Sequence, residues 1–193
     1  GNLTATQAGS AAIYVNGNVT SGIINITGGS VKHEEDVAVY IAGNADLNIS
    51  GGEITGTTGV EIRGGSLTIE GGTITATGTP ATATPNGNGT TTVGAAVAIS
   101  QHNTNHAINA TIKGGTFIGE NALYEADLQA DDQKATNVTL SVTGGTFKGK
   151  VGCSDATKLT GAIIGGTFSE TAKNGTNAEL LNAGFIWSKV ADD

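Results

Sequence analysis

The chain has 193 residues, of which 31 are glycine and 2 are proline, and 13% of its residues are charged. Its formal charge of −8 leaves no basic face for phosphates, so nucleic acids and anionic membrane surfaces are poor candidate partners. Glycine, threonine and asparagine are poor helix formers, and 37% hydrophobic residues can fill a narrow core, so the composition favours an all-β fold.

The sequence shows no apolar run long enough to cross a bilayer and no signal peptide. Because it contains no methionine, we expect it to be a mature fragment of a longer protein. A single cysteine, Cys153, excludes an internal disulfide and does not settle the compartment. No cofactor is expected.

A Gly-Gly step preceded by an alternating apolar segment recurs six times. The six segments are IINITGGSV (23–31), LNISGGEI (47–54), LTIEGGTI (67–74), ATIKGGTF (110–117), LSVTGGTF (140–147) and GAIIGGTF (161–168). The shortest spacings between steps define a unit of about twenty residues, and longer spacings indicate insertions.

A second apolar column precedes each step: AIYV (12–15), VAVYI (37–41), VEI (60–62), VAI (97–99), YEA (124–126) and VGC (151–153). Each unit thus holds three short extended pieces, which cannot bury their apolar faces alone. Stacking them in register predicts an all-β, right-handed parallel β-helix of about six three-strand turns. The runner-up is an antiparallel sandwich or propeller, which would need longer hairpins.

The period of two along a strand predicts which side chains point inward. We expect a first wall of Ile13, Val39, Val60, Val97, Tyr124 and Val151 beside Val15, Ile41, Ile62, Ile99, Ala126 and Cys153. We expect a second wall of Ile24, Leu47, Leu67, Ala110 and Leu140 beside Ile26, Ile49, Ile69, Ile112, Val142 and Ile163. The third wall comprises Val31, Ile54, Ile74, Phe117, Phe147 and Phe168.

The end of the chain departs from the repeat. Thr176 and Glu179 have the spacing of a helix capping box, and Gly184 suits the end of a short helix. The sequence therefore predicts one domain, with a parallel β-helix over 1–168 and a cap of a short helix and strand over 169–193.

Residues 11–168, with GGTFSE, AELLNAG and FIWSK in the tail, resemble the GGTF/GGTI repeats of pectate-lyase-like right-handed β-helix regions in bacterial cell-surface proteins. The resemblance implies a secreted or cell-surface location in a bacterium. It also implies a non-enzymatic module for structure or adhesion, whose partners are host or cell-wall glycans or another protein.

The alternative function is a polysaccharide-active lyase or hydrolase, because β-helix enzymes of that kind exist. Such enzymes carry clustered acidic and basic residues on one outer face. The expected outward column is Tyr14, Tyr40, Glu61, Ala98 and Glu125. It has no paired carboxylates beside a cation, and Arg63 is the only arginine. We therefore expect no catalytic residues.

Two candidate sites remain. Tyr14 and Tyr40 should stack on adjacent turns above Glu61, as a sugar-binding surface or, as we favour, a stabilising pair. The insertions 101–110 and 127–137 should protrude side by side, so His102, His106, Asp131 and Asp132 form a candidate metal site. Plain solvated surface is the more common state of such loops. We expect the charge run KHEED (32–36) to be solvated and 77–94 to be a flexible loop.

Overall fold

The computed structural model describes residues 1–80, 94–126, 137–169 and 178–183. In this part the chain is all-β, with a 14-stranded parallel sheet that does not close on itself and two short 3₁₀ helices. The strands are β1 (Asn2–Ala5), β2 (Ile13–Val15), β3 (Ile23–His33), β4 (Val39–Ile41), β5 (Asp46–Gly56), β6 (Val60–Ile62), β7 (Gly65–Ile69), β8 (Thr73–Ala76), β9 (Ala95–Ile99), β10 (Ile108–Ile112), β11 (Thr116–Glu125), β12 (Val138–Val142), β13 (Thr146–Cys153) and β14 (Thr167–Phe168). The 3₁₀ helices are η1 (Ala156–Leu159) and η2 (Ala178–Leu180).

Within the described residues the strands pair in three parallel ladders. The first ladder contains β2, β4, β6, β9 and the ends of β11 and β13. The second contains the first half of β3, the first half of β5, then β7, β10 and β12. The third contains β1, the second halves of β3 and β5, β8, the starts of β11 and β13, and β14. Successive units of the chain visit the ladders in this order.

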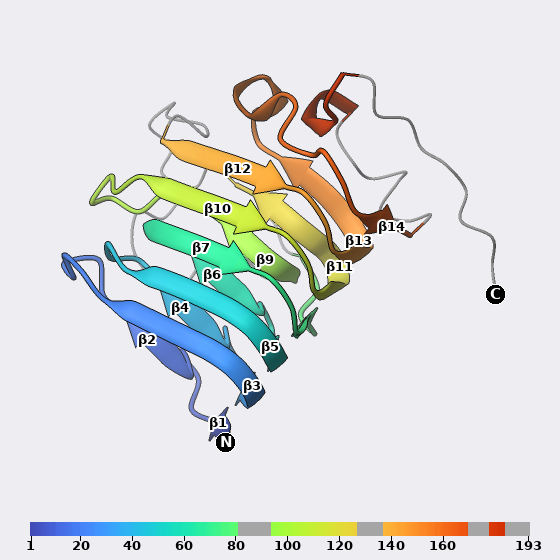
Figure 1. Ribbon diagram of the computed structural model, residues 1–193. Helices are drawn as coiled ribbons and strands as arrows, with labels where there is room; N and C mark the ends of the chain where they lie inside the picture. The colour runs from blue at the N-terminus through green and yellow to red at the C-terminus, as the bar shows by residue number, and fades with distance from the viewer. Residues whose placement is uncertain (81–93, 127–136, 170–177, 184–193) are drawn as a thin grey trace.

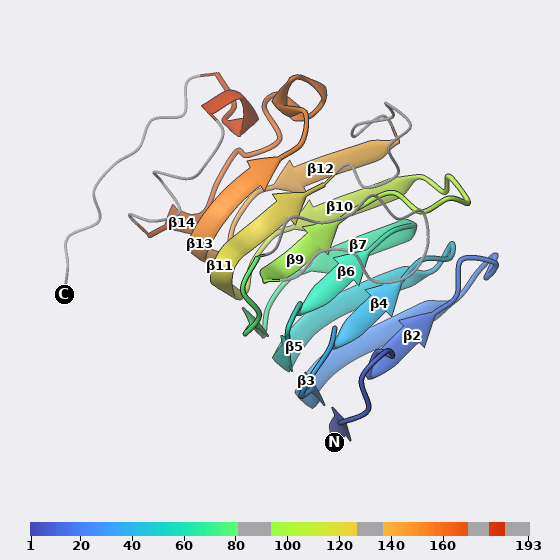
Figure 2. The ribbon, with the colours of Figure 1, turned by 180° about the vertical axis from the view of Figure 1, so that it is seen from behind.

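The ladders form layers around a narrow core. In Figure 1 the strands β3, β5, β7, β10 and β12 lie in front, and Figure 2 shows β2, β4, β6 and β9 on the opposite side. Both predicted series of the second wall and the whole third wall pair in the expected register. Most of these side chains are buried in one hydrophobic cluster, as alternation along a strand requires.

The Gly-Gly steps lie where the chain passes from the second ladder to the third. At one such step Gly52 has a φ of +92°, which only glycine adopts without strain. A Cβ on its neighbour Gly51 would lie 2.8 Å from the Thr27 carbonyl oxygen in the preceding unit. The recurring pair therefore allows both a sharp change of direction and close stacking of adjacent units.

The prediction was wrong in the fifth unit of the first wall. Leu123, rather than Tyr124, pairs with Val97, and Glu125, rather than Ala126, pairs with Ile99. Relative to β13, β11 has one extra residue on each side of Asn121. The predicted register was one residue out here, and a slip of one residue exchanges the inward and outward faces. Glu125 thus lies in the buried column that was expected to be apolar, with 1% of its surface exposed.

The two ends of the sheet differ. At the C-terminal end Ile163 bridges Val142 and Leu181, and Leu159 of η1 and Leu180 of η2 are buried on the core. The predicted capping residues Thr176 and Gly184 lie outside the described residues. At the N-terminal end β1 extends the third ladder alone, so the outer edges of β2 and of Ile23–Thr27 have no strand beside them among the described residues. No helix in the described part is long and apolar enough to cross a membrane.

Candidate functional site

Two tyrosines stack on the outward face of the first ladder, as the sequence predicts. The Tyr14 and Tyr40 rings lie 5.2 Å apart between centroids, with only 6° between their planes. Parallel pairing of β2 with β4 places the two residues directly beside each other. Tyr14 is 53% exposed and belongs to the terminal strand of its ladder, so no strand of the described part of the chain lies beside one face of its ring.

The rest of the predicted surface is buried, contrary to expectation. Tyr40 and Glu61 are each 0% exposed although they occupy outward positions. Tyr40 packs with Val37 and Ala42 in a small cluster separate from the main core, and Ala11 covers it. Only Tyr14 of the predicted set therefore remains available to a ligand, and Tyr40 supports it from behind.

Among the described residues, Arg63 is the largest fully buried side chain, and its sequence position predicted no role for it. Its Nε donates to the Ser100 carbonyl oxygen at 3.2 Å and its Nη2 donates to the Gln101 carbonyl oxygen at 2.7 Å. These contacts join residues 37 and 38 positions apart, which explains why sequence spacing did not indicate them. The only useful signal was that the chain has a single arginine, placed two residues after Glu61.

Burial and the charges of Arg63 and Glu61 together set the pKa of Tyr40. Burial raises the pKa of the Tyr40 phenol above its ordinary value, because the charged phenolate loses its hydration. The Arg63 guanidinium works against this shift through its charge and a hydrogen bond, whereas the Glu61 carboxylate adds to it. Tyr40 therefore stays protonated over a wider pH range than an exposed tyrosine and gives Tyr14 a neutral, fixed support.

The loop 100–107 reaches from β9 back to the first unit of the chain. His106 Nε2 lies 3.1 Å from the Gly17 carbonyl oxygen, and the His102 ring lies so close to Gly17 that any side chain there would collide with it. His102 Nδ1 accepts from the Thr104 N–H at 3.2 Å and lies 2.9 Å from Thr104 Oγ1. The loop is therefore folded onto residues that are more than eighty positions away.

The candidate metal site stays a prediction. His102 and His106 come from one loop as expected, but Asp131 and Asp132 lie outside the described residues. Among the residues that the structure describes, no three His, Cys, Asp or Glu side chains are placed to hold a metal ion. Burial lowers the pKa of His102, and the charges of Arg63 and His106 lower it further, so its ring is kept neutral.

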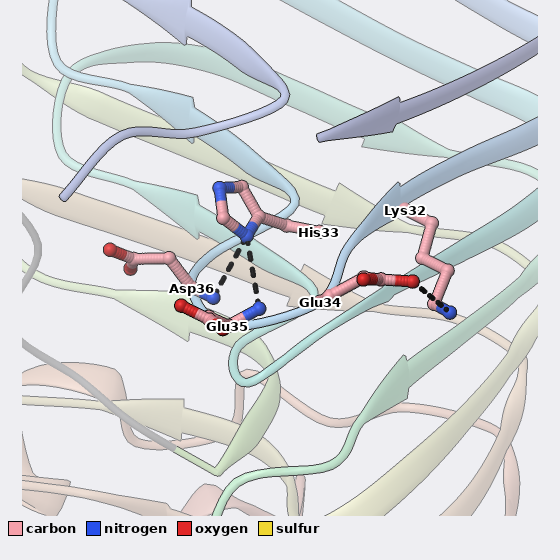
Figure 3. A network of polar contacts seen from close by, with 5 residues as sticks. All are labelled: Lys32, His33, Glu34, Glu35 and Asp36. Atoms are coloured by element: carbon pink, nitrogen blue, oxygen red, sulfur yellow. Dashed lines mark hydrogen bonds and ion pairs between the residues drawn. The ribbon is translucent and has the colours of Figure 1, made fainter. Parts of the chain in front are cut away.

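The charge run at 32–36 is only partly exposed, and Figure 3 shows the polar contacts of its side chains. The exposed pair Lys32 and Glu34 meets at 3.2 Å, as expected of a solvated run. His33 instead is 1% exposed, and its Nδ1 accepts the backbone N–H groups of Glu35 at 3.2 Å and Asp36 at 2.9 Å. Pairing of β1 with β3 places His33 beside Ala5, which explains its burial. His33 therefore stabilises the turn through these hydrogen bonds, and the prediction that the whole run is solvated was wrong at this residue.

Another buried polar residue, Glu125, lies beside Cys153, the only cysteine of the chain. Glu125 Oε2 accepts the Ser154 N–H at 3.0 Å and the Ser154 hydroxyl at 2.8 Å. Burial, together with the nearby carboxylates of Glu125, Asp155 and Glu179, raises the pKa of the Cys153 thiol to about 11. A thiol of this kind is a weak nucleophile, because little of it is ionised at neutral pH.

Comparison with known proteins found no match among family models, curated proteins or solved structures.

Proposed function

We propose that the chain is a right-handed parallel β-helix and a non-enzymatic surface module of a bacterial secreted or cell-surface protein. Three parallel ladders visited in a constant order support the coiled architecture. The right-handed sense rests on the strong general preference for right-handed connections between parallel strands. In this proposal residues 1–168 form the β-helix and 169–193 its cap.

The module contributes structure or adhesion. Its ligands are glycans of a host or a cell wall, and a protein partner is the other class of ligand. Tyr14 is the observation that carries the glycan proposal. Its ring is 53% exposed and is held flat by the buried ring of Tyr40, so little conformational freedom is lost on binding. A flat aromatic face suits the apolar C–H face of a sugar ring, and hydroxyl groups beside it find hydrogen-bond partners in side chains such as Asn16.

The test is a screen of the purified chain against a glycan array, followed by calorimetry on the hits. Tyr14→Ala should weaken binding at least about tenfold, whereas Ile23→Ala should preserve it, because Ile23 is an even more exposed apolar residue of the same unit on a different ladder. Absence of binding to every glycan would contradict the glycan proposal. Release of shortened products from a bound polysaccharide would instead assign a cleaving activity.

A further inference from the structure

The loop 100–107 is held at both ends, so its fold is fixed. Arg63 binds the carbonyl groups of Ser100 and Gln101, and the Arg63 carbonyl accepts the His102 N–H at 3.2 Å. At the other end the Gly65 N–H donates to the Ala107 carbonyl at 2.9 Å. Ser100 Oγ and Gln101 Nε2 are buried without a hydrogen-bond partner in the described part of the chain. Such groups are rare, and they are a reason to look for function nearby.

Contacts connect this loop to the exposed tyrosine. Asn16 Nδ2 donates to the Tyr14 hydroxyl at 3.4 Å, and Asn16 Oδ1 accepts the Asn18 N–H at 2.9 Å. The next residue, Gly17, is the one on which His102 and His106 lie. The turn after β2 and the loop after β9 therefore form one continuous surface, although about eighty residues separate them.

Most of the exposed side chains on this surface are amides. Asn16, Asn18, Asn103 and Asn105 are all exposed, and Asn105 has a φ of +54°, the only positive φ of a non-glycine residue in the described part of the chain. Residues of this kind in unusual backbone conformations often mark binding sites. Neither 13–20 nor 100–107 contains Asp, Glu, Lys or Arg, so the surface offers hydrogen bonds and little charge.

We infer that Tyr14, the turn 16–18 and the loop 100–107 form one binding site for a neutral, hydroxyl-rich oligosaccharide. Tyr14 stacks on one sugar ring, the amides bind hydroxyl groups, and Arg63 is a positioning residue that holds the loop through its two carbonyl contacts. This inference rests on the proposed function and names the ligand class and the second half of the site.

The experiment measures affinity for neutral oligosaccharides and for uronic-acid oligosaccharides of matched length. Wild-type protein should bind the neutral series more tightly. Tyr14→Ala should weaken binding at least about tenfold, as the loss of an aromatic anchor does. Asn105→Gly keeps the backbone conformation and removes the amide, so it should weaken binding about fivefold, the effect of one ordinary hydrogen bond. Asn109→Ala is the matched control, because Asn109 is an exposed amide on β10 outside the site.

Arg63 is tested by partial rescue. Arg63→Met should lose affinity, and Arg63→Lys should recover part of it in a protein with an unchanged circular dichroism spectrum, because lysine retains a charged donor for one carbonyl. If Arg63→Met does not fold, Asn105→Gly and His106→Ala still test the loop. A protein that binds through Tyr14 but is unaffected by both loop variants would overturn this inference alone. Preference for uronic acids would overturn the ligand class, and absence of any glycan binding would overturn the proposed function with it.

Discussion

Two stacks of aromatic rings in this protein follow the same ladder geometry but lie on opposite sides of their strands. Phe117, Phe147 and Phe168 stack inside the core at 4.8 Å between successive centroids, and Phe117 and Phe147 are fully buried. Tyr14 and Tyr40 stack at 5.2 Å on the outward side. The parallel register brings like residues together in both stacks, and the side of the strand decides what they do. The inner stack stabilises the fold, whereas the outer stack ends in an exposed ring.

The largest expected effect is the loss of the central phenylalanine. Phe147→Ala removes the ring between two others and leaves a cavity, so the free energy of unfolding should fall by about 3–5 kcal/mol. Thr146→Ala is the control, because Thr146 is adjacent but outward and should lose less than about 1 kcal/mol. Urea denaturation measures both values. Equal losses would contradict the inward assignment of Phe147.

A smaller effect is expected for the inner ring of the outer stack. Tyr40→Phe keeps the stacked ring but removes the hydroxyl group that interacts with the Arg63 guanidinium. A hydrogen bond to a charged partner contributes about 1.5–3 kcal/mol, so the free energy of unfolding should fall by an amount in this range. Tyr14→Phe, measured in the same denaturant series, should be nearly neutral. A neutral Tyr40→Phe would show that the hydroxyl group does not support the outer stack.

The exposed ring should matter little for stability. Tyr14→Ala removes a half-exposed side chain that stacks on one neighbour, so the loss should be about 1 kcal/mol or less. The same variant should weaken glycan binding at least about tenfold. Thermal denaturation and calorimetry on one preparation separate these effects. A large fall in stability would make Tyr14 part of the structural framework, as the inner phenylalanines are.

The last prediction concerns the pH dependence of stability. His102, near the outer stack, should make stability depend on pH, whereas the inner stack should not. The pKa of His102 is lowered in the folded state. As the pH falls below about 6.5, the unfolded state therefore binds more protons than the folded state. The protein loses stability over this range until the pH reaches the folded-state pKa of His102. His102→Asn should reduce this acid loss. Phe147→Ala should leave it unchanged. The measurement is the midpoint of urea unfolding between pH 5 and pH 8.

The sequence predicted most of the core because local signals agreed. The Gly-Gly steps fix where each unit begins, and alternation then assigns residues such as Leu47 and Ile54 to the inside. The prediction from alternation failed at β11, because the segment from Leu123 to Ala126 has apolar residues at both odd and even positions. The hydrogen bonds that Glu125 Oε2 accepts inside the protein come from Ser154, 29 residues further along the chain.

The candidate site was less predictable for the same reason. Stacking of Tyr14 on Tyr40 follows from the repeat alone and was confirmed. Burial of Tyr40 and Glu61 depends on what covers the outward face, and the period of a strand carries no information about that cover. The contact between His106 and Gly17 spans 89 residues, so only the folded chain brings them together.

The Gly-Gly step has a consequence for how this chain tolerates change. A side chain on Gly71 would meet the Ser50 carbonyl oxygen at 2.6 Å, so a substitution in one unit displaces its neighbour as well. The loop 100–107 connects the first ladder to the second, whereas in the described part of the chain at most three residues separate the second ladder from the third. A foreign epitope grafted between β8 and β9, which residues 77–94 separate, should therefore be displayed on an intact scaffold, and the same graft between β7 and β8 should prevent folding.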